Sequence, residues 1–193
     1  MRRTTLLLAA LLLAGCSTAQ QQQDPHSAHV HPAAAPPSSS APARPGGFSD
    51  TDAAYVQLAI PQDETVLPVL HLAKTRQGVN PALAALAAEV ETGHQKELEG
   101  LRKALTTAGQ TYLAMHDGHD MPGMVTADEL DELTKATGPA FDDELRTLLK
   151  AHFEESTTVA KSELGAGSSP EVLELTKGIE ASRAEYLAKL GTG

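Results

Sequence analysis

The chain has 193 residues, which is the length of one domain with a tail. Its 25 acidic residues outnumber its 15 Lys and Arg, and the formal net charge of −10 argues against a nucleic-acid partner, which requires a basic surface. A single Cys excludes an intramolecular disulfide framework, and an aromatic content of only 3% favours an all-α fold over a β-sandwich or barrel.

The first sixteen residues have the order of a lipoprotein signal peptide. Basic residues 2–3 precede an apolar run, residues 5–13, that is too short to span a membrane. The run ends in Leu13-Ala14-Gly15-Cys16, which resembles a bacterial lipobox and implies cleavage after residue 15 and lipid on Cys16. The alternative is a chance Cys behind an ordinary secretory signal. We therefore expect a lipid-anchored, extracytoplasmic protein on the cell membrane or outer membrane, with the bilayer as a partner through acylated Cys16.

Residues 16–47 have the composition of a disordered tether. Runs of Gln, Ala and Ser with interspersed Pro cannot bury enough apolar surface to offset the entropy of ordering. His26, His29 and His31 lie within this segment, and they either bind a divalent metal loosely or are incidental to a polar spacer.

From residue 48 onward, apolar residues recur at helical spacing, which predicts a domain over residues 48–193. Long helices are expected over residues 50–76, 81–108 and 139–164 and from residue 170 onward. A loop over residues 109–125 and a short helix over residues 126–136 are expected to connect the second and third long helices. Pro61 and Pro68 lie inside the first helix and predict a kink or a break there.

The long helices form two similar hairpins, residues 48–108 and 138–193, separated by residues 109–137. Asp52-x-x-Tyr55 corresponds to Asp142-x-x-Leu145, and each second helix begins with Pro followed by similarly spaced apolar residues. A duplicated hairpin with short turns predicts an antiparallel four-helix bundle.

Polar residues interrupt the apolar stripes at one level of this bundle. They are Gln62, Asp63, His94, His152 and Arg183. Each lies about 18–21 Å along its helix from the hairpin turn, so turns at the same end would place all five in one layer. Two interpretations remain open: a reduced metal site formed by Asp63, His94 and His152, or a metal-free layer held by an Asp63–Arg183 ion pair. A buried guanidinium disfavours a divalent ion at this level.

Enzymatic motifs are incomplete. Glu91-x-x-His94 matches half of a di-iron carboxylate site, but the corresponding Glu180-x-x-Arg183 lacks the second His. The chain also has no glycine-rich phosphate loop and no Gly-x-Ser-x-Gly motif. We therefore do not expect an enzyme.

The loop after the second helix contains a cluster of soft ligands. Its residues are Met115, His116, His119, Met121 and Met124. Thioether and imidazole groups suit Cu(I) or Ag(I), which predicts copper as a bound ion. The alternative is a connecting loop whose methionines cover the end of the bundle.

From about residue 48 to residue 190 the chain resembles the bacterial "domain of unknown function 305" (DUF305) family, whose members are often secreted lipoproteins. The motifs that carry the resemblance are Phe48-Ser49-Asp50-Thr51-Asp52-x-x-Tyr55 with Ile60-Pro61, His119-Asp120-Met121-Pro122-Gly123-Met124, Phe141-Asp142, and the turns at Pro81 and Pro170. The resemblance implies a ferritin-like four-helix bundle, with copper or silver handling in some members.

The chain departs from the family at the polar layer. A His-His pair is usual in each repeat, but Gln62-Asp63 and His152-Phe153 stand in its place, and His94 and Arg183 stand where Gln is usual. The Met/His loop matches the pattern of the family more closely than the polar layer does. Our leading hypothesis is therefore a lipoprotein that binds or buffers Cu(I) through this loop. The rival is a metal-free structural or protein-binding envelope lipoprotein whose family metal site has degenerated.

Overall fold

The computed structural model describes residues 44–192, and all regular secondary structure in that range is helical. The elements are the 3₁₀ helix η1 (Pro45–Gly47) and the α-helices α1 (Asp50–Thr75), α2 (Pro81–Thr107), α3 (Ala127–Lys135), α4 (Pro139–Ala166) and α5 (Pro170–Thr192). The predicted signal peptide, Cys16 and the histidines at positions 26, 29 and 31 lie outside the described residues. Among the described helices, none is long and apolar enough to cross a membrane.

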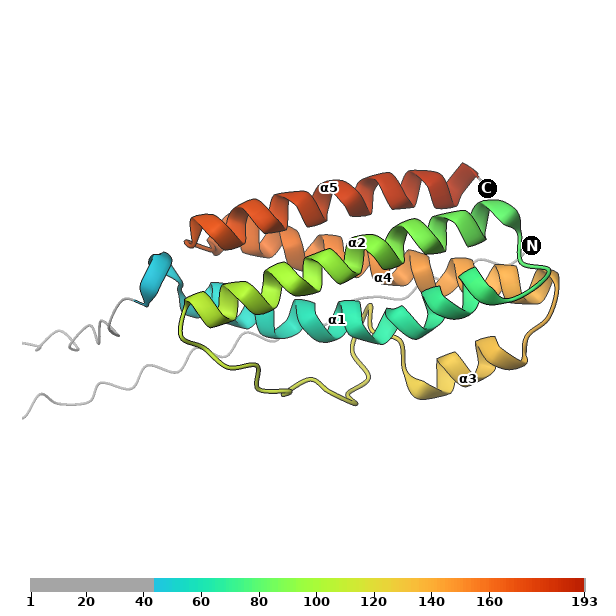
Figure 1. Ribbon diagram of the computed structural model, residues 1–193, viewed down its shortest axis with the longest axis horizontal. Coiled ribbons are helices and arrows are strands. Elements are labelled where there is room, and N and C mark those ends of the chain that lie inside the picture. The colour runs from blue at the N-terminus through green and yellow to red at the C-terminus, as the bar shows by residue number, and fades with distance from the viewer. Residues whose placement is uncertain (1–43, 193) are drawn as a thin grey trace, which may run out of the picture. The chain divides into compact units, whose positions relative to one another are not determined.

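The four long helices form a bundle in which every adjacent pair is antiparallel (Figure 1). The adjacent pairs are α1 with α2, α4 with α5, α1 with α4, and α2 with α5. It follows that α1 faces α5, and α2 faces α4, diagonally across the core. The predicted all-α antiparallel four-helix bundle is confirmed.

The two hairpin turns lie at opposite ends of the bundle. Near the start of α1, Asp52 Oδ1 accepts hydrogen bonds from the amides of Ser168 (3.1 Å) and Ser169 (3.0 Å) in the α4–α5 turn. Near the start of α4, Asp142 Oδ1 accepts one from the amide of Asn80 (3.2 Å) in the α1–α2 turn. The arrangement considered from the sequence, with both turns at one end, is therefore not the one found. The polar residues still share one level, because each lies near the middle of a long helix and is about equally far from both ends.

Helix α1 is continuous through both of its prolines. Ser49 and Asp52 form a capping box at its start, and Pro61 and Pro68 lie within the helix. Each Pro removes one backbone hydrogen bond. The break that was one expected outcome does not occur, since fully buried residues beside the prolines, including Ile60 and Val66, hold the helix in the core.

Two apolar clusters fill the core on either side of the polar level. One contains Val69, Leu83, Phe141 and Leu190, and the other contains Tyr55, Ile60, Leu101 and Val172. The polar residues therefore lie at mid-height, where their helices are held from both sides.

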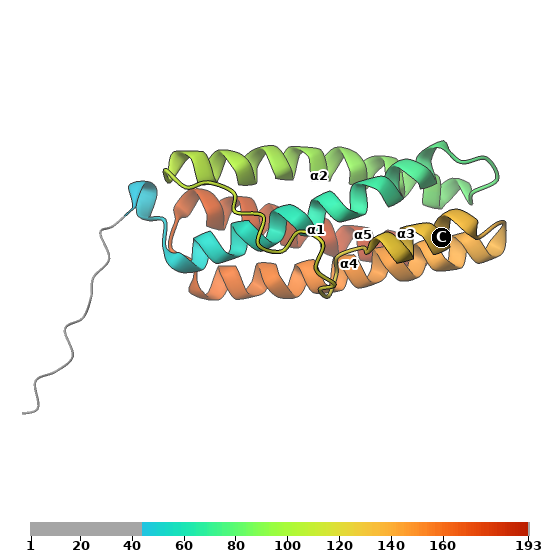
Figure 2. The ribbon, with the colours of Figure 1, turned by 90° about the horizontal axis from the view of Figure 1, so that it is seen from below.

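The segment between α2 and α4 runs back along the bundle, as Figure 2 shows, and its short helix α3 packs on α1 and α4. This crossover makes α2 and α4 parallel, and it carries the Met/His loop, residues 115–124, past the middle of the bundle.

The 3₁₀ helix η1, which precedes α1 in the chain, is formed by Pro45–Gly47, although these residues were predicted as the end of the tether. Buried Phe48 and a hydrogen bond from Ser168 Oγ to Gly47 O (2.7 Å) hold them in place.

Candidate metal centre

Four helices each contribute polar side chains to one buried level, which we name the central layer. It consists of Asp63 (α1), His94 and Glu97 (α2), His152 (α4) and Arg183 (α5). Asp63, His94, His152 and Arg183 are each exposed by 2% or less. The layer is therefore shielded from solvent, and each of its polar groups needs a partner inside the protein.

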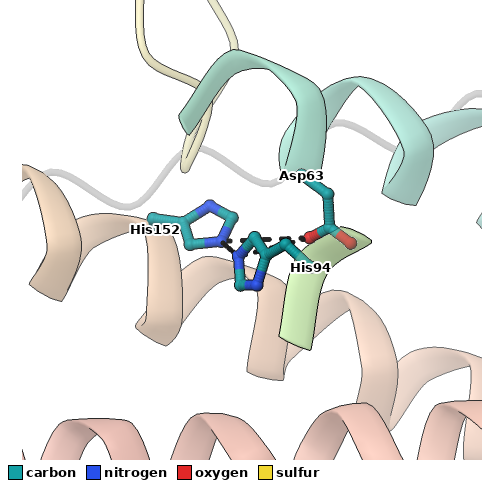
Figure 3. Close-up of side chains that lie close together, drawn as sticks. All are labelled: Asp63, His94 and His152. Carbon is teal, nitrogen blue, oxygen red and sulfur yellow. Dashed lines mark hydrogen bonds and ion pairs between the residues drawn. The ribbon is translucent and has the colours of Figure 1, made fainter. Parts of the chain in front are cut away.

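One diagonal of the layer is a pair of imidazoles (Figure 3). His94 Nε2 lies 2.8 Å from His152 Nε2, and His152 Nδ1 lies 2.9 Å from the carbonyl oxygen of Gly123. Since Nδ1–H of His152 donates to that carbonyl, its Nε2 accepts a hydrogen bond from His94. Burial and the charge of Arg183 lower the pKa of both rings, to about 3 for His152. Both imidazoles are neutral at pH 7, which is the form that binds metal ions.

The other diagonal is an ion pair. Arg183 Nη2 donates to Asp63 Oδ1 (2.9 Å) and Glu97 Oε2 (2.7 Å), and Nη1 donates to Glu97 Oε1 (3.1 Å). Its Nε donates to Ser156 Oγ (3.0 Å). The expected Asp63–Arg183 pair is present. Burial raises the pKa of Asp63 well above its usual range, against the opposing effect of Arg183.

Three ligand atoms of the layer are close enough to share a metal ion. Asp63 Oδ1 lies 3.6 Å from His94 Nε2 and 4.0 Å from His152 Nε2, and the three atoms lie within 4.8 Å of one another. Among the described residues, Asp63 Oδ2 has no hydrogen-bond partner. Two imidazoles and a carboxylate suit copper or zinc, so the donor set fits a metal ion.

The Met/His loop contacts the bundle at the same level. A cavity of about 230 Å³ lies between loop and bundle, and its lining includes Met121, Met124 and His152. Gln62, predicted as part of the layer, donates from Nε2 to Pro122 O (3.5 Å) and so lies beneath the loop. Met115, His116 and His119 do not line this cavity, and Met115 is 52% exposed. The loop cluster predicted from sequence is thus divided between the cavity and the remainder of the loop.

Gly123 allows the loop to approach this closely. Its φ of 76° is in the left-handed region, and a Cβ at this position would lie 2.6 Å from Glu155 Cβ. Glycine, which has no Cβ, adopts this φ readily and leaves the Glu155 side chain in place. The carbonyl that orients His152 therefore depends on this residue.

The sequence profile of the DUF305 family, a domain of unknown function, matches residues 52–192. The chain belongs to the DUF305 family. No curated protein matches the chain.

Solved structures share the DUF305 fold. A DUF305 fragment from Deinococcus radiodurans has 15% identity and a TM-score of 0.66, covering 75% of this chain and 95% of that one. A DUF305 protein from Streptomyces coelicolor, assigned as secreted, has 15% identity and a TM-score of 0.64, covering 72% and 89%. CopM in its Cu(II)-bound form has 20% identity and a TM-score of 0.63, covering 72% and 93%. At these identities the likeness concerns the fold.

Three participants in this DUF305 layer were missed from the sequence. Glu97 binds Arg183 with both oxygens, Ser156 accepts from the same guanidinium, and Gly123 orients His152. Glu97 and Ser156 each follow a predicted layer residue by about one helical turn, which is a usable signal. The Gly123 contact is made by a backbone carbonyl and has no comparable signal.

A second group of buried acids lies at the start of α1, which we name the end cluster: Ser49, Asp52, Glu163, Ser168 and Ser169. Asp52 and Glu163 are exposed by 0% and 1%. Burial opposes the charge on Asp52, but hydrogen bonds from Ser49 and Ser169 overcome it and hold the Asp52 pKa well below its usual range. Burial and the adjacent Asp52 raise the pKa of Glu163 to about 8. At pH 7 this pair therefore carries one proton.

Proposed function

We propose that this DUF305 chain is a membrane-anchored, extracytoplasmic protein that binds or buffers a soft metal ion, Cu(I), beneath its Met/His loop. The observation that carries the proposal is the cavity that Met121 and Met124 share with His152. Two thioethers and an imidazole are the ligand types that Cu(I) prefers. His94 and Asp63 lie directly behind His152 and extend the site into the core.

The likeness to CopM in its Cu(II)-bound form supports copper as the ion to test first. The role proposed is the binding of a metal ion.

An anaerobic Cu(I) competition titration tests the proposal. The background chain carries Cys16→Ser together with alanine at the tether histidines His26, His29 and His31, so that neither the thiol nor the tether competes. We expect one Cu(I) to bind tightly and the affinity to fall at least tenfold in the Met121→Leu/Met124→Leu variant. Met115→Leu is the matched control and should leave the affinity within about threefold. Equal affinity in the double variant and the background chain would exclude the cavity as the site.

The rival function, a metal-free structural or protein-binding module, is favoured by one observation. Arg183 already satisfies Asp63 Oδ1 and both oxygens of Glu97 without a metal ion. If this module is the function, Cu(I) will not bind stoichiometrically and will not change the melting temperature. Ligand binding to the folded state alone raises that temperature, so the two functions give opposite results.

Lipid anchoring through Cys16 is a separate part of the proposal. The lipobox resemblance at residues 13–16 supports it, and the secreted assignment of the Streptomyces coelicolor relative supports the extracytoplasmic location alone. In the native host, the wild-type chain should incorporate labelled fatty acid and sediment with membranes. Cys16→Ser should do neither, and a Ser17→Ala control should behave as wild type. Soluble, unlabelled wild-type protein would exclude the anchor and leave the metal proposal intact.

A further inference from the structure

The two methionines of the loop cavity belong to one tight turn. Met124 N donates to Met121 O (3.0 Å) across Pro122 and Gly123, and Gly123 has a φ of 76°. A Pro followed by a residue of positive φ is the pattern of a type II turn, whose first and last Cα atoms lie within about 7 Å of each other. Since both methionines also line the same cavity, the turn places their thioethers within reach of one ion.

The imidazole that lines this cavity already has other partners. His152 Nδ1–H donates to Gly123 O, and His152 Nε2 accepts from His94. The ring can therefore bind an ion in the cavity only after one of these hydrogen bonds breaks. Two thioethers carry no charge, so a cation between them in a partly buried cavity requires a negative group nearby.

The charged groups that line the cavity are carboxylates. Asp120 and Glu129 belong to the described lining, which contains no Lys or Arg. Asp120 is exposed, so water weakens its interaction with a charge in the cavity, whereas Glu129 is only partly exposed. The lining therefore favours a positively charged occupant, and Glu129 is the carboxylate with the larger expected effect.

The capping box of α3 holds Glu129 in place. Glu129 Oε2 accepts hydrogen bonds from Thr126 N (2.8 Å) and Thr126 Oγ1 (2.8 Å). Within residues 44–192, its other oxygen, Oε1, accepts no hydrogen bond, and the carboxylate forms no ion pair. A carboxylate that is fixed by one oxygen and free at the other can face an ion with little further loss of side-chain freedom.

We propose that Glu129 supplies the negative charge that holds a soft, singly charged cation, Cu(I) or Ag(I), between Met121 and Met124. The thioethers select a soft ion, and the carboxylate, which is a hard ligand, contributes through its charge. The ion site then lies within residues 121–129 and does not require the central layer. This inference rests on the proposed function and names the residue that determines the affinity of that site.

Ag(I) titrations of the background chain and its Glu129→Gln variant test the proposal, since Ag(I) does not change oxidation state on binding. Gln also serves in a capping box, so this substitution removes the charge while the bonds to Thr126 remain. The ε-methyl ¹³C shifts of Met121 and Met124 locate the ion, and competition titrations give the affinity.

We expect Glu129→Gln to lower the Ag(I) affinity at least fivefold, with both methyl signals still shifting and the melting temperature of the ion-free chain unchanged. Glu132→Gln is the matched control, because Glu132 lies on the same helix, pairs with Lys135 at the surface and changes the net charge equally. Its affinity should stay within about twofold of the background chain. Asp120→Asn should lower the affinity less than Glu129→Gln does.

A second measurement requires no substitution in the site. The side-chain carboxyl ¹³C signal of Glu129 should move when Ag(I) binds to the background chain, and that of Glu132 should not. An unmoved Glu129 signal overturns the inference, as does unchanged affinity in folded Glu129→Gln or an equal loss in Glu132→Gln.

The methionine signals separate this inference from the proposed function. Ag(I) that shifts both methyl groups, with an affinity independent of Glu129, overturns the inference and leaves the cavity as the metal site. If Ag(I) shifts neither methyl group and Cu(I) affinity is equal in the background chain and the Met121→Leu/Met124→Leu variant, both fail.

Discussion

Two pairs of carboxylates are buried in this bundle, and their charge is compensated in different ways. In the central layer, Asp63 and Glu97 share the guanidinium of Arg183. In the end cluster, Asp52 is held as an anion by hydroxyl and amide donors, and Glu163 retains a proton. The central layer thus contains a fixed cation beside its carboxylates, whereas the end cluster is held by hydroxyl and amide donors and by the proton on Glu163.

The difference determines what each level responds to. The central layer depends on the identity of one side chain and on any cation that enters beside it. The end cluster depends on pH, because its compensating charge exchanges with solvent protons.

Arg183→Leu should break the central layer. Removal of the guanidinium leaves Asp63 and Glu97 buried without their partner, and the free energy of unfolding should fall by about 3–5 kcal/mol. Urea denaturation measures the loss. The control is Arg102→Leu, whose pairing with Glu64 is exposed and should contribute about 1 kcal/mol or less. Similar losses in the two variants would mean that the central ion pair does not form.

Glu163→Gln should alter the pH dependence of stability. The folded pKa of about 8 exceeds the unfolded value of 4.5, so between these values the folded chain holds a proton that the unfolded chain has released. This contribution is complete below pH 4.5 and is lost as the pH rises to about 8, with a slope of at most about 1.4 kcal/mol per pH unit. The Gln variant remains neutral and should lack that slope in urea denaturation from pH 5 to 9.

The control for this profile is Glu154→Gln, also on α4, because Glu154 is 54% exposed at its side chain and pairs with Lys150 at the surface. Its profile should follow that of the wild type. A Glu163→Gln profile parallel to the wild type would place the proton elsewhere.

Gly123→Ala should loosen the loop that covers the central layer. The alanine must adopt a positive φ, and its Cβ meets Glu155. We therefore expect the free energy of unfolding to fall by about 2–3 kcal/mol, near the top of the range for a strained backbone position. Gly118→Ala is matched in φ, at 72°, but meets nothing within 4 Å and should cost about 1 kcal/mol. Thermal unfolding of both variants isolates the contact. Equal losses would show that the loop does not press on α4 at this point.

Asp142→Ala should have the smallest effect. Asp142 corresponds to Asp52 in the other repeat, but it accepts a hydrogen bond of 3.2 Å from Asn80 and is only half-buried. We expect a loss of about 0.5–1.5 kcal/mol in urea denaturation. Asp52→Ala should cost more, because its carboxylate joins Ser49 to the amides of Ser168 and Ser169. A larger loss at Asp142 would reverse the comparison between the two ends.

The helices and the polar level could be predicted because they depend on local periodicity. His94, His152 and Arg183 interrupt apolar stripes near the middle of their helices, and the structure brings them together. Glu97 was missed although it follows His94 by three residues, because a charged side chain is normally assigned to solvent unless its partner is known. That partner, Arg183, is 86 residues away.

The path of the chain between α2 and α4 could not be predicted from the sequence either. No periodicity in the loop indicates that it crosses the full bundle, yet this crossover puts the two turns at opposite ends and brings Gly123 onto His152. The contribution of Met121 and Met124 to a shared cavity also depends on that path. The sequence could identify them as soft ligands without indicating which histidine they would meet.

The central layer also has a consequence for helix alignment. Its members come from four different helices, and a slip of any helix by one turn moves its side chain by about 5.4 Å, which is beyond hydrogen-bond reach. Apolar residues on either side tolerate such slips more readily, so the layer fixes the register of the bundle in the way that a buried polar residue fixes a coiled coil. Replacing Asp63, His94, Glu97, His152 and Arg183 together by apolar residues should therefore preserve the helices while amide spectra reveal several coexisting alignments.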